Sequence, residues 1–155
     1  MDTDTDLTKI REEFIEKIGI IAQAEGMPRI SGRLFALLVF EGRRYSFSEL
    51  AKQLEVSRGS ISAVARLLED RGLIKRVANP GDRQDYFQLG DAPYMTLLQG
   101  AAQNARRSKH EIETTIAQLP AAQQDLAARL QAYAGFYDAI DESMSVAADR
   151  LDTKE

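Results

Sequence analysis

The chain has 155 residues, 44% of them hydrophobic and 28% charged, which is typical of one folded domain with extensions and unlike a disordered chain. No apolar run approaches the ~20 residues that cross a bilayer, and no basic-then-apolar signal peptide opens the sequence, so we expect a soluble, cytoplasmic protein. The sequence contains no cysteine, which excludes disulfides, thiolate metal sites and cysteine nucleophiles.

The formal net charge of −4 is unevenly distributed along the chain. Residues 1–32 carry 4 basic and 7 acidic side chains, residues 33–90 carry 10 and 7, and residues 91–155 carry 6 and 10. Within the middle segment, residues 43–83 hold 9 basic against 5 acidic side chains, a local charge of +4. A modest local excess of this kind is typical of a small domain that contacts phosphate groups.

The first two segments predict helices. Between Asp6 and Glu25 apolar residues recur at spacings of three and four, and a Gly-Met-Pro sequence ends the pattern. Residues 31–41 are almost wholly apolar, which fits either a buried helix or a strand. We expect a helix, because Ser31 can cap its N-terminus and Gly42 can end it.

Two more helices and a hairpin follow. Ser46 and Glu49 have the spacing of a capping box and open a short helix. After a two-residue link, Ser57 begins another helix that runs through Arg71. LIKRVA and RQDYFQL then flank the turn NPGD, which predicts an antiparallel hairpin. Two closely joined helices followed by a hairpin form a winged helix-turn-helix, so the expected fold class is mainly α with a winged helix-turn-helix domain.

Residues 91–155 predict two long helices, with Pro93 near the start of one and Pro120 at the boundary with the next. The last helix carries an uninterrupted heptad seam, and a seam of this length needs a partner helix. It could fold back on its own chain, but we favour a homodimer, because the first helix also offers an apolar stripe. The predicted dimer contacts are Leu7, Ile10, Phe14, Leu126, Leu130, Tyr133, Tyr137, Ile140 and Met144. The expected division is a dimerisation helix at 1–28, a DNA-binding domain at 29–90 and C-terminal dimerisation helices at 91–155.

The stretch VSRGSIS at residues 56–62 is unusual for a helix start, because small and polar residues form helices weakly. The apolar period turns Ile61, Val64 and Leu68 toward the core and the small residues and two arginines outward. Small residues let a helix backbone approach base edges, and free amides, hydroxyls and arginines bind phosphate or guanine. The alternative is that Ser57 is only a cap and that Gly59 only reflects loop geometry.

The run SFSELAKQLEVSRGSISAVARLLEDRGLIKRVANPGDRQDYFQL resembles the winged helix-turn-helix of MarR-type bacterial transcriptional regulators. VSRGSISAVARLLEDRGLI with GDRQDYF, and the upstream PRISGRLFALLVF, are most similar to the GbsR-like branch. The similarity covers about residues 7–90, and the C-terminal third resembles the family only in having two long helices. The resemblance implies a DNA-binding homodimer with a small-molecule pocket between the dimerisation helices and the DNA-binding domain.

The resemblance also assigns site residues. It implies that Ser57, Arg58, Ser60, Ser62 and Arg66 lie on the recognition helix, and that Arg83 on the wing approaches the minor groove. The basic hairpin adds Lys75 and Arg76 to the predicted DNA-binding residues. An ion pair with Asp82 or Asp85 is expected to aim Arg83, and the alternative is a solvated pair of charges in the turn. The wing is shorter and carries fewer arginines than the commoner MarR wing.

An enzyme is the weakest alternative. The single histidine, His110, lies in the polar run RRSKHE, and the sequence has no glycine-rich phosphate loop, paired catalytic carboxylates or nucleophile motif. We therefore expect no catalysis, no cofactor and no metal. A second alternative is a winged-helix protein-interaction module that does not bind DNA. We favour a sequence-specific transcriptional regulator, a repressor, which binds a two-fold symmetric operator in double-stranded DNA as a homodimer and is released by a small-molecule effector.

Overall fold

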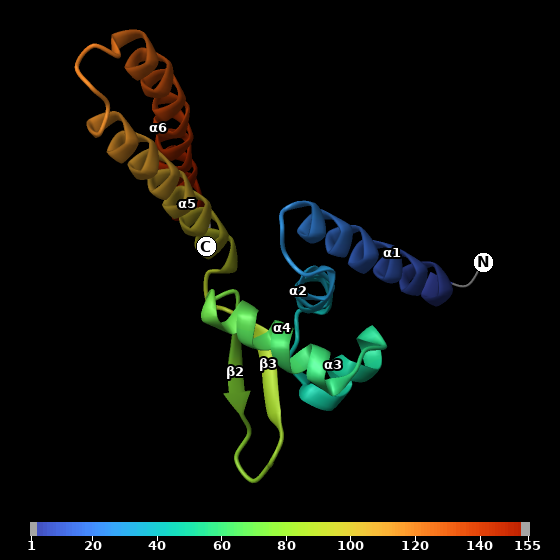
Figure 1. The fold of residues 1–155 in the computed structure, drawn as a ribbon. Coiled ribbons are helices and arrows are strands. Elements are labelled where there is room, and N and C mark those ends of the chain that lie inside the picture. The colour runs from blue at the N-terminus through green and yellow to red at the C-terminus, as the bar shows by residue number, and fades with distance from the viewer. Residues whose placement is uncertain (1–2, 153–155) are drawn as a thin grey trace. The chain divides into compact units, whose positions relative to one another are not determined.

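The computed structural model describes residues 3–152, and this part of the chain forms six helices and three short strands (Figure 1). It divides into two compact units, with the boundary between Pro93 and Tyr94. The mainly helical fold and the winged helix-turn-helix are confirmed. The three-part division by role stays a prediction, and the first helix lies in the same compact unit as the winged helix.

The helices α1 (Thr3–Ala24) and α2 (Arg29–Glu41) pack against each other in the first unit. Their contact is close because two glycines face it: a Cβ on Gly32 would lie 2.5 Å from the Ala22 Cβ, and a Cβ on Gly19 would lie 2.7 Å from the Arg33 Cγ. The Phe14 and Phe40 rings, 5.8 Å apart, extend the contact. Small residues therefore set how near these two helices lie.

The predicted capping role of Ser31 is wrong. The N-cap of α2 is Pro28, and Ser31 lies inside the first turn, buried, with its hydroxyl donating to the Pro28 carbonyl at 2.5 Å. The fixed φ of proline suits a helix start, and the observed cap lies three residues before the predicted one. The predicted end is confirmed: Gly42 has a left-handed φ of 66°, and its N–H donates to the Leu38 carbonyl.

The helix-turn-helix consists of α3 (Phe47–Leu54) and α4 (Arg58–Asp70). The predicted capping box at α3 is confirmed, because the Glu49 N–H donates to the Ser46 Oγ at 3.1 Å and the Ser46 N–H to the Glu49 carboxylate at 3.0 Å. Glu55 ends α3 with a left-handed φ of 54°. This reversal places α4 directly after α3 with only a short turn between them.

The predicted hairpin is confirmed as β2 (Ile74–Ala78) and β3 (Asp85–Leu89), which pair antiparallel (Figure 1). A third strand, β1 (Tyr45–Ser46), pairs with the other edge of β3, so the order is β1-β3-β2. The sequence did not predict β1, because two residues are too few to show an alternating pattern. The pairing attaches the hairpin to the segment immediately before α3.

The core of the first unit lies where α2, α3, α4 and the sheet meet. Ile61, Val64 and Leu68 of α4 are buried in it, as predicted. Its largest fully buried side chains are Tyr45, Phe87, Leu34, Leu37, Leu38, Leu50, Leu54, Ile61 and Ile74. Because this core holds one side of α4, the opposite side of that helix is left at the surface.

The second unit is an antiparallel helical hairpin of α5 (Pro93–Ala117) and α6 (Gln124–Asp152) (Figure 1). Ala134 is buried in it, and the Lys109 ammonium lies 2.6 Å from the Asp138 carboxylate and the Arg106 guanidinium 3.0 Å from Asp141. The predicted position of Pro93 at a helix start is confirmed, as is the boundary at Pro120.

The heptad seam of α6 is not centred on the contact with α5. Ala134, Asp138 and Asp141 mark the side of α6 that faces α5. At about 100° per residue, the seam from Leu126 to Leu151 is centred roughly a quarter turn away from that side. Tyr133 on the seam is 52% exposed, and its ring lies 5.3 Å from that of Tyr137. The seam is thus only partly covered within the hairpin.

Among residues 3–152, no helix is both long enough and apolar enough to cross a membrane.

Candidate nucleic-acid interface

The N-terminus of α4 is fixed by Ser57. The Ser57 Oγ accepts a hydrogen bond from the Ser60 N–H at 3.1 Å and donates one to the Ser60 Oγ at 3.0 Å. Ser57 is therefore the N-cap, which the DNA-binding interpretation and its alternative both predicted, and its hydroxyl is hydrogen-bonded within the helix. The remaining free amides of the first turn point out of the end of the helix, where a phosphate group would be favoured.

The exposed face of α4 consists of small residues between two arginines, as predicted. Gly59, Ser62 and Ala63 are exposed, and so are Arg58 and Arg66. A Cβ added to Gly59 would meet only the Ser57 Oγ, at 3.9 Å, so nothing in the chain requires a glycine there. The Ser62 hydroxyl has no hydrogen-bond partner within residues 3–152. The small side chains on this face therefore have no packing role in the described chain.

The predicted cations fall into two groups. Arg66 and Arg83 form no ion pair with any described residue, and the Arg58 guanidinium lies over the Phe47 ring at 5.4 Å. In contrast, the Lys75 ammonium lies 2.6 Å from the Asp91 carboxylate. Arg76 is held by two carboxylates, Asp85 at 2.9 Å and Glu69 at 3.5 Å. The cations of α4 and of the wing tip are thus available to phosphate, whereas those of β2 are already neutralised.

The expected ion pair that aims Arg83 does not form. The Asp82 carboxylate accepts hydrogen bonds from the Tyr86 hydroxyl at 2.6 Å and from the Gln84 N–H at 2.9 Å. Asp85 pairs with Arg76 across the hairpin instead. Neighbouring charges in a sequence suggested a pair with Arg83, but the strand register brings Arg76 to Asp85 and the turn brings Tyr86 to Asp82.

Two further arginines border this surface, and sequence reasoning missed both. The Arg43 guanidinium stacks on the Tyr45 ring at 3.6 Å and lies 3.5 Å from Glu49. The Arg44 guanidinium donates to the Asn79 side-chain oxygen at 2.6 Å. The signal was the basic pair GRRYS directly before the capping box, which places two cations beside the start of α3.

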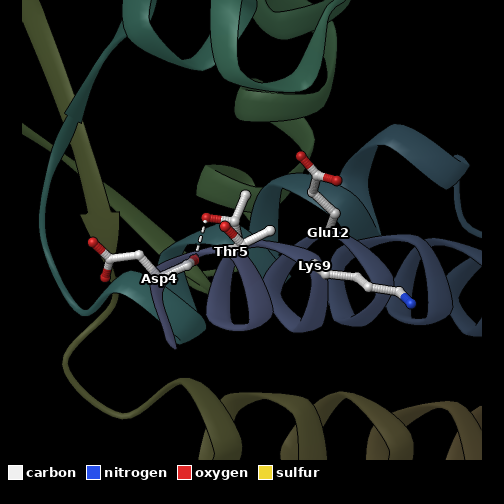
Figure 2. Close-up of a pocket in the computed structure, with 5 residues that line it drawn as sticks. Asp4, Thr5, Lys9 and Glu12 are labelled. Carbon is white, nitrogen blue, oxygen red and sulfur yellow. Dashed lines mark hydrogen bonds between the residues drawn. The ribbon is translucent and has the colours of Figure 1, made fainter. Parts of the chain in front are cut away.

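A hollow of about 380 Å³ on α1 has a different character (Figure 2). Asp4, Thr5, Thr8, Lys9 and Glu12 line it, and all five are exposed residues of this one helix. Their polar ends do not converge on a common point, and Thr8 donates to the Asp4 carbonyl of the preceding turn (Figure 2). Within residues 3–152 no group of three or more His, Asp or Glu is arranged to hold a metal ion.

The fold is a winged helix in which α4 exposes small residues and two arginines. Residues 25–85 match the sequence model of the MarR family. The HTH-type transcriptional regulator MmpR5 of Mycobacterium tuberculosis is 44% identical over 78 residues, 50% of this chain and 47% of that protein. The HTH-type transcriptional repressor OpcR of Bacillus subtilis is 28% identical over 93 residues, 60% of this chain and 50% of that protein.

A solved structure described as a transcriptional regulator aligns with a TM-score of 0.78 at 27% identity, over 92% of this chain and 98% of that one. The matched segments span about half the length of the curated relatives. Over residues 25–85 the chain is thus similar to the MarR family, and its fold resembles that of a solved transcriptional regulator over most of both chains.

Proposed function

We propose that this protein is a homodimeric, sequence-specific DNA-binding transcriptional repressor of the GbsR-like branch, which acts in the cytoplasm and catalyses no reaction. The observation that carries the proposal is the outer face of α4. Its residues are small where the chain itself gives no packing reason, as at Gly59, and Arg66 has no carboxylate partner among the described residues. A helix that must enter a major groove needs both properties.

The proposed DNA-binding residues are those predicted from the sequence, but we expect smaller contributions from the two cations of β2. Ser62, Arg58 and Arg66 face outward on α4, and Ser57 and Ser60 form its capped end. The resemblance to the family supports a minor-groove contact by Arg83 at the wing tip. Lys75 and Arg76 contribute less, because their carboxylate partners compete with phosphate.

Two apolar surfaces that the described chain covers only in part support dimerisation. On α1, Leu7 and Ile10 are 55% and 56% exposed, while Phe14 packs on α2. On α6, the seam residues lie to one side of the contact with α5, with Tyr133 the most exposed of them. A two-fold symmetric dimer would cover these surfaces and would present two copies of α4 to half-sites about one helical turn, ~10 bp, apart.

Repression and release by a small molecule rest on the family resemblance. OpcR, one of the relatives, is named a repressor. The GbsR-like branch rests on the motif of residues 56–74 with the wing sequence GDRQDYF.

The test uses the full chain and a duplex that the wild-type protein selects from a random-sequence pool. We expect an electrophoretic shift with a dissociation constant that rises steeply with salt, because each phosphate contact releases counterions. Sedimentation should give twice the 17.3 kDa chain mass. If the protein selects no duplex at low salt, the alternative of a protein-interaction module is favoured. If it is a stable monomer, the predicted dimer and its two-fold symmetric operator are wrong.

A further inference from the structure

The turn at the tip of the hairpin is held at both ends by side chains that the DNA-binding proposal does not use. Its backbone is a β-turn in which the Asp82 N–H donates to the Asn79 carbonyl at 3.1 Å. Pro80 occupies the second position, and Gly81 the third with a φ of 80°, as a type II turn requires. Arg83, the proposed minor-groove residue, directly follows this turn.

The end of the turn is fixed by Asp82. One carboxylate oxygen accepts from the Gln84 N–H at 2.9 Å and the other from the Tyr86 hydroxyl at 2.6 Å. The bond from Tyr86, followed by that from Gln84, lowers the pKa of Asp82, and the same contact with Asp82 raises the pKa of Tyr86. Arg83 therefore lies between Asp82 and Gln84, and the hydrogen bond that joins these two residues holds the backbone on either side of it.

The beginning of the turn is fixed from the helix-turn-helix. Arg44 precedes β1 and reaches across to the Asn79 side-chain oxygen at 2.6 Å, although the two residues are 35 positions apart in the chain. Strand β1 itself pairs with β3, with Ser46 opposite Tyr86. The turn is thus tied both to β3 and to the segment that starts α3. We call Arg44, Asn79, Asp82 and Tyr86 the wing latch.

The wing latch also decides which charges Arg83 meets. Asp82 and Asp85 are the nearest carboxylates in sequence, but Asp82 is occupied by Tyr86 and Gln84, and Asp85 by Arg76. Arg83 consequently has no carboxylate partner among residues 3–152. A group held ready and unpaired loses less entropy and breaks no ion pair when it binds.

From this arrangement, which adds to the proposed function and rests on it, we propose that the wing latch positions Arg83 for duplex DNA. Its four members are positioning residues that act through Arg83 and not by contacting DNA themselves. Loss of the latch would let the turn move and let Arg83 pair with the freed Asp82 carboxylate. The latch would thereby set how much of the binding affinity the wing supplies.

The test is a double-mutant cycle with Tyr86→Phe and Arg83→Ala, measured as binding to the selected duplex. Tyr86→Phe removes one hydroxyl and keeps the ring in β3. We expect it to weaken binding about five- to tenfold in the wild-type background and to have no effect in the Arg83→Ala background, because coupled residues are not additive. Tyr94→Phe, on α5, is the matched control and should leave binding unchanged.

Asp82→Ala gives a second, independent measurement. Removing an acidic residue from a surface that meets DNA should strengthen binding if charge alone mattered. The wing latch requires the opposite, a loss of about the size seen for Tyr86→Phe. Thermal melting of each variant should match the wild type, since the turn is exposed.

The outcomes separate the latch from the function it rests on. If wild-type protein binds and Arg83→Ala weakens binding, but Tyr86→Phe and Asp82→Ala do not, the latch is wrong and the proposed function stands. Equal losses from Tyr86→Phe with and without Arg83 would show a merely structural hydroxyl and overturn the latch. Failure of the wild-type protein to select any duplex would overturn both.

Discussion

Small residues line two helix surfaces in the first unit, at the contact between α1 and α2 and on the outer face of α4. At the first, a Cβ on Gly32 would lie 2.5 Å from Ala22 and 2.7 Å from the Ile18 carbonyl, so the glycine admits a neighbouring helix. At the second, a Cβ on Gly59 would meet no atom closer than 3.9 Å. Packing therefore explains the first set of small residues and does not explain the second, which we propose faces DNA.

The largest expected effect tests the α4 surface. Ser62→Leu should weaken binding to the selected duplex by about 30-fold or more, because a blocked base edge costs about 1–3 kcal/mol and occurs twice in a dimer. The free energy of unfolding should change by less than about 0.5 kcal/mol, since position 62 is exposed and leucine favours helices. Ser145→Leu on α6 is the control. Unchanged binding by Ser62→Leu would mean that α4 does not enter a groove.

The next prediction compares an arginine that has no carboxylate partner with one that has two. Arg66→Ala should cost about 1–3 kcal/mol on the selected duplex if the side chain reads a base, or lower the salt slope by about one if it contacts phosphate. Arg76→Ala should change binding by less than about threefold, because Glu69 and Asp85 already hold its guanidinium. Salt titrations of both variants measure the difference. Equal losses would show that ion pairing does not decide which cations serve DNA.

At the contact between α1 and α2, a substitution should change the stability of the fold. Gly32→Ala should lower the free energy of unfolding by about 1–3 kcal/mol, because the two helices must move apart to admit the methyl group. Gly100→Ala, where an added Cβ meets nothing within 4 Å, is the control and should be neutral or stabilising. Urea unfolding measures both. A Gly32→Ala protein as stable as wild type would contradict the close packing described above.

Gly59→Ala makes the same glycine-to-alanine change on the exposed face of α4 that Gly32→Ala makes at a helix contact. The added methyl group has room in the chain, so stability should be equal or up to ~1 kcal/mol higher. Binding to the selected duplex should nevertheless weaken about five- to tenfold, which corresponds to roughly 1 kcal/mol. Thermal melting and a binding titration on the same preparation give both numbers. If stability rises and the affinity for DNA is unchanged, Gly59 is needed neither for DNA binding nor for packing, and the prediction is wrong.

The smallest effect concerns the charges beside the α1–α2 contact. A hydrogen bond from Arg29, with the nearby charges of Arg33 and Arg29, lowers the pKa of Glu16 in the folded chain. The stability that Glu16 adds is therefore complete above its ordinary pKa and is lost as pH falls through the lowered folded value. We expect less than about 1 kcal/mol, because the pair is largely solvated. Glu16→Gln should remove this acid-side loss in urea unfolding at several pH values, while Glu12→Gln should retain it.

Several elements could be predicted from local sequence because their causes are local. The capping box at Ser46 and Glu49, the cap at Ser57 and the left-handed end at Gly42 each need only residues a few positions apart. The buried and exposed faces of α4 followed from helical period. The capping role given to Ser31 failed because Pro28, just outside the apolar run, is the better helix start.

The ion pairs and the sheet edge could not be predicted in this way. Arg76 meets Asp85 across a strand register, and Arg44 meets Asn79 across 35 positions. Charge patterns along the sequence do not contain such distances. The same holds for Arg83, for which neighbouring carboxylates suggested a partner that the turn gives to Tyr86 instead.

The sequence by itself determined the order of helices and hairpin, the core-facing side of α4 and the resemblance to MarR-type regulators, because caps, turns and apolar periods act over a few residues. Only the tertiary structure decided which cations are neutralised, which glycine a neighbouring helix requires, and that the α6 seam lies beside the contact with α5. Each of those depends on residues far apart in the chain, whose meeting is set by packing and register.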